Sequence, residues 1–309
     1  MDLQFRELTL SDAEHYIERW NKCGQAIAAY SFSSVWSWAA DFGTEVVYDE
    51  DADLYWIRQS NNKLKNLAPV GDWKRNDWAD VLRKYAGNEI EMYLVPEVLV
   101  RMWCKALSGT AEINATEDRG AWEYVYDIRA LASLAGRKYM KKRNHVNKFK
   151  RDVSYIYEPI TVNNLNEILE FQESWYRTNA IHNSVTLAQE NRSVRNVLSN
   201  WDRIPNRCGG ALRANGRIIA YTTGETVGDC LIVHYEKASH EYADGAAYQV
   251  INQEFLRHTL EQLPDLKRVN REEDLNEPGL RAAKMSYMPD DFIKLYSVKI
   301  KFGSAARIY

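Results

Sequence analysis

The sequence predicts a mixed α+β protein in two successive halves, each with a mostly antiparallel sheet flanked by helices. Its 309 residues are 45% apolar and 27% charged, which is enough material for one large core or two ordinary ones. Short strand patterns and amphipathic helical patterns follow one another along the chain, and this series starts again after Arg151. We therefore expect one domain at residues 1–152 and a second at residues 153–309.

The composition narrows the class of protein. A net charge of −3 excludes a globally basic nucleic-acid binder but allows a local basic patch. The four cysteines are far apart in apolar contexts and lack metal-ligand spacing, so we expect buried thiols and no metal site. Because no segment has the pattern of a leader or of a membrane span, we expect a cytoplasmic protein without integral membrane association.

The first half alternates between helical and strand patterns. Ser11 and Asp12 give an N-cap signal before a helical pattern, and residues 30–42 space their aromatic rings for one helical face. The later elements of this half are an antiparallel meander at 45–48, 54–58 and 64–70, a helix at 73–87, a strand at 89–95, a helix opened by Pro96, strands at 111–116 and 122–127, and a helix at 128–134.

The second half contains a strong hairpin signal. Strands at 209–213 and 217–223 flank Asn215 and Gly216. The other elements of this half are a strand at 155–157, helices at 163–179 and 186–201, a strand at 231–236, a helix at 245–260, a strand at 267–269, a short helix at 280–285 and a closing strand at 292–300.

The strongest local charge signal is the segment GRKYMKKRNHVNKFKR at residues 136–151, which contains no acidic residue. In a helix its basic residues form a ridge, while Tyr139, Val146 and Phe149 face inward. One reading is a solvated face that links the two halves. The other is a surface for a phosphate-rich partner, whose binding would weaken steeply with salt. The candidate phosphate contacts are Arg137, Lys138, Lys141, Lys142, Arg143 and Lys148.

A second charged stretch, LKRVNREEDLNEPGLRAAKMSYMP at residues 266–289, alternates charge signs between short apolar anchors. Its strand ends at Val269, and Pro278 with Gly279 interrupts the chain before a short helix. A strand, a charged loop and a helix in succession are typical of a polar site. Ordinary surface ion pairs are the alternative interpretation.

The order of elements in the second half resembles the GNAT acyltransferase fold, and the first half resembles a diverged copy of it. From about Ser11 to Lys301, the chain resembles the family of uncharacterised proteins related to the C-terminal domain of phosphatidylglycerol lysyltransferase. The resemblance is carried by YVYDIRALASLAGRKYMKKRNHVNKF at 124–149, VHYEKA at 233–238 and VNREEDLNEPGLRAAKMSYMP at 269–289. It implies two tandem GNAT-like domains and a similarity to Fem-type aminoacyltransferases, which take an amino acid from aminoacyl-tRNA.

Acyl transfer of this kind requires a base or proton shuttle and donors for the oxyanion of the tetrahedral intermediate. The candidate catalytic residues are Glu236, Arg271 and His234. His234 and Glu236 are two residues apart, so both side chains should leave one face of their strand, while Lys237 leaves the other. We favour Glu236 as the base or the ammonium-binding group; a structural ion pair is the alternative.

The loop after Val269 supplies candidates for substrate binding. Asn270 and Arg271 can hold an anion or polarise a carbonyl group, and the acidic residues at 272–274 can hold an amino group. Arg271 is expected to pair with the substrate or with Glu236, because guanidinium suits carboxylates and phosphates. The full set of candidate substrate contacts is Lys237, Asn270, Glu272, Asp274, Lys284 and Tyr287.

The donor and the acceptor stay open. Acyl-CoA enzymes of this fold usually carry Arg/Gln-x-x-Gly-x-Gly/Ala, whose N–H groups cradle pyrophosphate. Residues 242–247, YADGAA, keep Gly245 and Ala247 but have Tyr242 at the Arg/Gln position. We therefore expect a transferase that moves an activated aminoacyl group, from aminoacyl-tRNA, or an acyl group to an amine or hydroxyl acceptor. A CoA-dependent N-acetyltransferase and a noncatalytic module for a small charged ligand are the alternatives. The acceptor can be a lipid, a peptide or a small amine.

Overall fold

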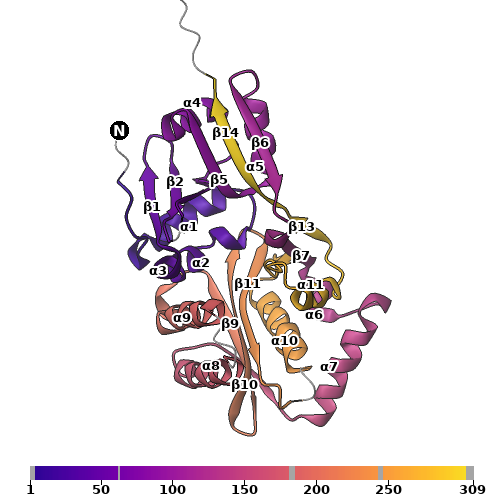
Figure 1. Cartoon of the computed structure of the whole chain (residues 1–309). Coiled ribbons are helices and arrows are strands. Elements are labelled where there is room, and N and C mark those ends of the chain that lie inside the picture. Colours follow the sequence, from indigo (N-terminus) through magenta and orange to yellow (C-terminus); the bar gives the residue numbers. More distant parts are fainter. Residues whose placement is uncertain (1–3, 62, 181–184, 243–245, 304–309) are drawn as a thin grey trace, which may run out of the picture.

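Two sheets, one above the other in Figure 1, organise the computed structural model, which describes residues 4–61, 63–180, 185–242 and 246–303. Each sheet has seven strands in this part of the chain, and helices cover them. Most strand pairs are antiparallel; the exceptions are β3 with β5 and β11 with β12. The predicted mixed α+β architecture is confirmed.

The first sheet lies in the N-terminal half. Its strand order is β1 (Thr44–Asp49), β2 (Leu54–Gln59), β3 (Lys65–Leu67), β5 (Glu89–Pro96), β14 (Leu295–Phe302) and β6 (Ala111–Glu117), with β4 (Val70–Gly71) paired to β2. The helices of this half are α1 (Ala13–Lys22), α2 (Phe32–Ser37), α3 (Ala39–Phe42), α4 (Trp78–Ala86) and α5 (Glu97–Ala106), with short 3-10 turns η1 (Leu10–Asp12), η2 (Ala28–Tyr30) and η3 (Arg119–Ala121).

The second sheet carries the regions that the sequence singled out. Its order is β13 (Asp291–Ile293), β7 (Glu123–Asp127), β12 (Arg268–Asn270), β11 (Cys230–Ala238), β10 (Arg217–Val227), β9 (Arg207–Ala214) and β8 (Ile156–Pro159). The helices are α6 (Ile128–Ser133), α7 (Met140–Asp152), α8 (Leu165–Asn179), α9 (Val185–Ser199), α10 (Ala246–Gln262) and α11 (Pro278–Met285), with 3-10 turns η4 (Arg137–Tyr139) and η5 (Trp201–Arg203).

Local chemistry explains why several elements form where the sequence predicts them. The hairpin between β9 and β10 turns at Asn215 and Gly216, which both have positive φ, 50° and 76°, as a type I′ turn requires. The predicted basic segment forms η4 and α7. Its inward-facing residues Tyr139, Val146 and Phe149 are buried. Aromatic residues of the segment 30–42 enter the core as expected, with Tyr30 and Phe32 fully buried.

The sheets do not divide at residue 152, where the sequence predicts the domain boundary. Strand β7 leaves the first half and pairs with β12 and β13, whereas β14 returns to the first sheet between β5 and β6. The predicted closing strand at 292–300 is therefore two strands in two sheets, separated at Lys294. Alternation along this segment is continuous, so only the partner strands reveal the break.

Two smaller departures concern exposure and length. Cys104 is exposed on α5, so the expectation of four buried thiols is wrong for this residue. The predicted helix at 73–87 begins only at Trp78, because Trp73 is held in the preceding loop, where its indole N–H donates to the carbonyl of Pro69.

In the described part of the chain, none of the helices combines the length and the apolarity needed to cross a bilayer.

Helix α2 of the first half packs against the second half through a buried polar chain. The hydroxyl of Ser37 lies 2.6 Å from that of Ser193 on α9, which lies 2.6 Å from the hydroxyl of Tyr235 on β11. The indole N–H of Trp38 also donates to Tyr235, at 3.0 Å. Buried polar groups are costly when unpaired, so these contacts fix the position of α2 on the second sheet.

The exchanged strands predict that neither half folds alone. A fragment of residues 1–152 lacks β14, which leaves facing edges of β5 and β6 unpaired, and a fragment of residues 153–309 lacks β7, which joins β12 to β13. We expect each fragment to lack a cooperative thermal transition by circular dichroism, and coexpression to restore one. A monomeric 1–152 fragment with a cooperative transition would contradict this coupling.

Candidate functional site

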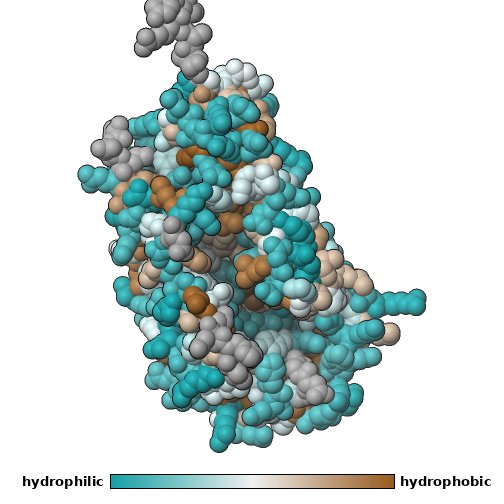
Figure 2. Space-filling model, in the orientation of Figure 1, coloured by the Kyte–Doolittle hydropathy of each residue, from teal (hydrophilic) through white to brown (hydrophobic). Residues whose placement is uncertain are grey.

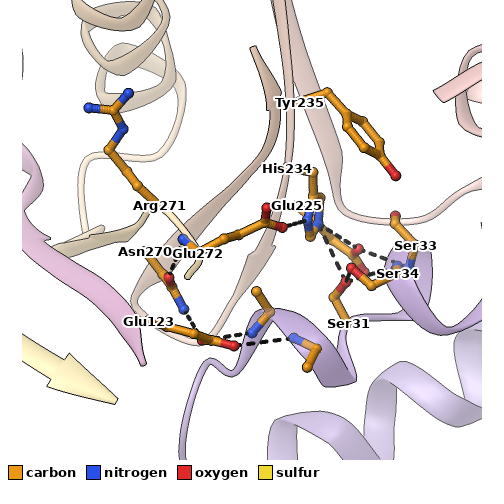
Figure 3. A network of polar contacts seen from close by, with 12 residues as sticks. Ser31, Ser33, Ser34, Glu123, Glu225, His234, Tyr235, Asn270, Arg271 and Glu272 are labelled. Carbon is orange, nitrogen blue, oxygen red and sulfur yellow. Dashed lines mark hydrogen bonds and ion pairs between the residues drawn. The ribbon is translucent and has the colours of Figure 1, made fainter. Parts of the chain in front are cut away.

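The candidate site lies where two parallel strands separate. β11 and β12 pair from Cys230–Arg268 to Ile232–Asn270; β11 then continues to Ala238, while the chain after Asn270 enters a loop. Polar side chains beyond the carboxyl ends of neighbouring parallel strands face a common crevice. The sequence-predicted residues of β11 and of the 270–274 loop meet here, but in separate groups (Figure 3).

A β-bulge at His234 decides which residues come together. Thr223 pairs with Tyr235 and Gly224 pairs with Val233, so His234 has no opposite residue on β10. After the bulge, Glu236 contacts α10, whereas His234 contacts α2. The expectation that these two side chains share a face is therefore wrong, because strict alternation assumes a strand without an inserted residue.

The first group is an ion pair between Arg271 and Glu236. Their side chains are 3.1 Å apart and each is 14% exposed, so the pair is shielded yet reachable. The other oxygen of Glu236 accepts a hydrogen bond from Asn252 of α10, at 3.0 Å. Although burial opposes the charge, the Glu236 carboxylate holds the pKa of Arg271 above its ordinary value.

The ring of Tyr287 also belongs to this first group, because two cations contact it. The guanidinium carbon of Arg271 lies 5.0 Å from its ring centroid, and the ammonium of Lys142 on α7 lies 4.2 Å from the same centroid. Burial raises the pKa of Tyr287 to about 12, so its hydroxyl stays protonated at neutral pH. Lys142 thus connects the basic helix to the candidate site.

The second group surrounds His234. Its Nδ1 lies 2.8 Å from Glu272, and its Nε2 lies 3.5 Å from the buried Glu225 and 3.4 Å from the hydroxyl of Ser31. Figure 3 shows Glu272 pointing toward His234, whereas Arg271 points away from it. Burial opposes protonation, but the two carboxylates prevail and raise the pKa of His234 to about 9.

This geometry limits the chemistry of His234. An imidazolium held between two carboxylates is already protonated at neutral pH and cannot accept a proton. It can donate hydrogen bonds and hold Glu272, whose φ of 58° places it in the left-handed region. His234, one of the three candidate catalytic residues, is therefore suited to positioning the loop rather than to accepting a proton.

The side chain of Asn270 makes its hydrogen bonds within the protein. Its amide group donates to the carbonyl of Ala26 at 2.8 Å and to Glu123 at 2.5 Å, while its oxygen accepts from the N–H of Glu272 at 2.8 Å. Glu123 also accepts from the N–H groups of Ala28 and Ala29, and burial raises its pKa to about 8. Asn270 thus ties the loop to the first half instead of presenting a donor to a ligand.

Three more of the predicted substrate contacts also have structural partners. Asp274 is fully buried and binds Arg119, Arg281 and Tyr124, and Arg281 holds its pKa well below the ordinary range. Lys284 donates to the carbonyls of Arg271 and Glu273, and burial lowers its pKa. Lys237 pairs with Glu190 on the opposite face of the sheet, with its ammonium 4.3 Å from the ring centroid of Trp175.

The basic residues of α7 and η4 also differ in role. Lys138 lies 3.6 Å from Asp290. Arg143 donates to the carbonyls of Leu134, which caps the end of α6, and of Gly136, which precedes η4. Arg137, Lys141 and Lys148 are exposed, with no carboxylate partner among the described residues. Of the two predicted cofactor contacts, Ala247 is buried in the core in the first turn of α10, and Gly245 lies outside the described residues.

Sequence reasoning missed Glu225, Asn252, Ser31 and Glu123, which hold the two groups in place. Glu225 had a recognisable signal, since a carboxylate inside the buried strand RIIAYTTGETV must find a partner. Gly224 beside it marks the bulge, because a Cβ there would lie 2.4 Å from the carbonyl oxygen of Ile232. Ser31 and Glu123 had no such signal in the sequence, because their contacts join segments far apart in the chain.

The two sheets and the separation of β11 from β12 give the chain a tandem GNAT-like fold. The model of the phosphatidylglycerol lysyltransferase C-terminal family matches residues 21–299. The chain therefore belongs to this family, which supports a transferase and confirms the family resemblance read from the sequence.

Known structures agree with this assignment. A conserved protein of unknown function from Bacteroides thetaiotaomicron is 28% identical, with a TM-score of 0.85 over 97% of this chain and 100% of that one. L-PGS from Bacillus licheniformis is 12% identical, with a TM-score of 0.60 over 98% and 94% of the two chains. FemX is 8% identical, with a TM-score of 0.61 over 97% and 98%. At these identities, the last two similarities concern the fold alone.

A curated relative matches over a shorter length. An uncharacterised protein of Mycoplasmoides gallisepticum is 22% identical over 192 residues, which are 57% of this chain and 56% of that protein. The matched segment thus spans little more than half of that relative.

The His234 group predicts a pH-dependent contribution to stability. Below pH 6.5, the ordinary pKa of histidine, the residue is protonated whether folded or unfolded, and its two ion pairs contribute fully; this contribution is lost as the pH rises through about 9. The difference in unfolding free energy between wild type and His234→Gln should therefore shrink by about 3 kcal/mol between these limits. Denaturant titrations at several pH values measure it.

The matched control for this experiment is His240→Gln. His240 is an exposed histidine that lies two residues after the end of β11. This variant leaves the contacts of His234 with Glu225 and Glu272 in place, so it should not reproduce the effect of His234→Gln. An NMR titration of the His234 ring should place its midpoint near 9. A midpoint at or below 6.5 would rule out the imidazolium clamp.

Proposed function

We propose that this protein transfers an aminoacyl group from aminoacyl-tRNA to an amine or hydroxyl acceptor. The observation that carries this proposal is the Arg271–Glu236 pair, part-buried at the separation of β11 and β12, with the basic helix α7 reaching the same place through Lys142. The family assignment and the FemX-like fold support an aminoacyl donor.

In the proposed reaction, the acceptor atom forms a bond to the ester carbonyl carbon, and the bond from that carbon to the tRNA ribose oxygen breaks. The proton lost by the acceptor ends on the departing ribose hydroxyl. Negative charge develops on the carbonyl oxygen, and a donor placed there lowers the barrier most effectively in a shielded site.

Arg271 and Glu236 suit the two roles that this reaction requires. A guanidinium has five N–H donors, and the contacts of Arg271 with Glu236 and Tyr287 leave others for the carbonyl oxygen. Glu236 is fixed by Arg271 and Asn252, and its remaining lone pairs can accept the acceptor's proton or bind its ammonium. The acceptor class, whether lipid, peptide or small amine, follows from no single contact.

Mass spectrometry of reactions with the purified protein tests the donor. The protein is incubated with a mixture of aminoacyl-tRNAs or of acyl-CoAs, together with lipid, peptide and amine acceptors. We expect products whose mass increases by one aminoacyl residue. Products formed only from acyl-CoA would favour an N-acetyltransferase, and binding of donors without any product would favour a noncatalytic module.

Substitutions in the pair should separate function from stability. Arg271→Gln and Glu236→Gln are expected to lower the rate of transfer by about a hundredfold or more, the usual effect of removing a group that stabilises the transition state. The chain should still unfold cooperatively, because each partner keeps a second contact, to Tyr287 or to Asn252. Transfer rates and thermal melts measure the two effects.

The matched control is Arg268→Gln, at the other end of the same strand. Arg268 pairs with Asp229 at 2.6 Å, and its side chain is exposed, so the same chemical change occurs outside the candidate site. This variant should keep the wild-type rate. Loss of folding in Arg271→Gln and Glu236→Gln, with full transfer by the molecules that remain folded, would instead make the pair part of the scaffold.

A further inference from the structure

Lys142 is a half-buried cation without a counter-charge in the part of the chain that the structure describes. It lies on α7 at the margin of the candidate site, with its ammonium 4.2 Å from the ring centroid of Tyr287. Among the described residues, no carboxylate lies within ion-pair distance of it, unlike Lys138 and Lys150 of the same basic segment, which pair with Asp290 and Glu254. Burial and the nearby Arg271 both lower its pKa.

Counted over the described residues, the environment of Tyr287 therefore carries an excess of positive charge. Arg271 and Lys142 both contact its ring, whereas Glu236 is the carboxylate that faces this group, and it is bound by Arg271 and Asn252. Two cations that approach one another away from bulk water disfavour each other's charged form. An anion beside Lys142 would remove this penalty, so the charge balance favours an anionic ligand.

The surroundings of Lys142 are polar and accessible. His145, one turn further along α7, lies 3.4 Å from the side chain of Gln249 on α10, so the two helices present polar groups to each other beside the site. Figure 2 shows a hydrophilic hollow on this face in the region of α10 and α11. Lys142 itself is partly exposed, so a ligand can reach it without the core opening.

The outer face of α7 leads away from this position. Lys141 precedes Lys142 and points about 100° around the helix, toward solvent. With Arg137, Lys148 and Arg151 it forms an exposed basic surface that has no carboxylate partners among the described residues. A polyanion on this surface would continue directly to Lys142, which favours a nucleic acid over an isolated small anion.

The spacing between Lys142 and Arg271 further limits the classes of ligand that fit. Both cations contact the same aromatic ring, that of Tyr287, so they lie a short distance from each other. In a 3′-aminoacyl nucleotide, one ribose separates the 5′-phosphate from the ester, a similar span. In acyl-CoA, the whole pantetheine arm lies between the pyrophosphate and the thioester, which is far longer than one ring.

We propose that Lys142 binds the phosphate of the terminal nucleotide of an aminoacylated RNA, with the adjacent ester placed at Arg271. This inference rests on the proposed function and gives it a residue that selects an RNA-borne donor over acyl-CoA. Lys142 is a binding residue; it takes no part in the making or breaking of bonds.

The test compares ligands that differ by one phosphate. Puromycin is a stable 3′-aminoacyl nucleoside analogue, and its 5′-monophosphate adds the group that Lys142 is inferred to bind; AMP and adenosine form a second pair without an amino acid side chain. Calorimetry should show that wild type binds the phosphorylated member of a pair about tenfold more tightly or better, as one charge-assisted contact provides. Lys142→Met should abolish this preference while leaving the affinity for the unphosphorylated member unchanged.

Lys148→Met is the matched control, because Lys148 is exposed on the same helix and does not contact Tyr287. It should retain the phosphate preference. The inference is overturned if wild type shows no preference, if Lys142→Met keeps it, or if Lys148→Met loses it equally. Binding of coenzyme A, or of phosphatidylglycerol vesicles, that depends on Lys142 in place of the nucleotide would also overturn it.

The outcomes distinguish this inference from the proposed function. Aminoacyl transfer from tRNA by a protein whose phosphate preference does not depend on Lys142 would leave the function standing and remove the binding role of Lys142. A preference that depends on Lys142, without transfer from any donor, would leave the phosphate site and remove the enzyme.

Discussion

The early end of the pairing between β11 and β12 is the constraint on which the candidate site depends. Beyond Ile232 and Asn270, the two strands no longer satisfy each other's polar groups. The charged residues that follow must therefore be paired by their side chains, since a part-buried charge without a partner is unfavourable. Arg271 pairs with Glu236 and His234 with Glu272, and Asn252 of α10 and Ser31 beside α2 add further contacts.

The exchange of β7 and β14 makes this convergence rigid. Because each sheet contains a strand from the other half, the first half cannot move freely against the second. Ser31 and Ser33 of the α2 region are thereby held against His234 and Glu225, and Glu123 of β7 is held against Asn270. The positions of the loop residues 270–274 are thus set by both halves, although the loop belongs to one.

The two groups at the site differ in charge. Around His234, Glu225 and Glu272 balance one imidazolium and close the group upon itself. Around Tyr287, Arg271 and Lys142 face one carboxylate among the described residues, Glu236. This difference supports the proposal that the first group positions the loop and the second contacts the ligand, even though their residues alternate along the same strand and loop.

The sequence by itself determined the classes of element, the hairpin at Asn215 and Gly216 and the basic helix, and it left the substrate and Glu236 as alternative partners of Arg271. The elements depend on local periodicity and turn chemistry, which short segments express. Only the tertiary structure decided that His234 and Glu236 face different neighbours, that residues 292–300 divide between two sheets, and that Asn270, Asp274 and Lys284 serve the scaffold. A bulge, a strand exchange and a buried hydrogen bond each depend on contacts between residues far apart in the chain, which a single sequence does not reveal.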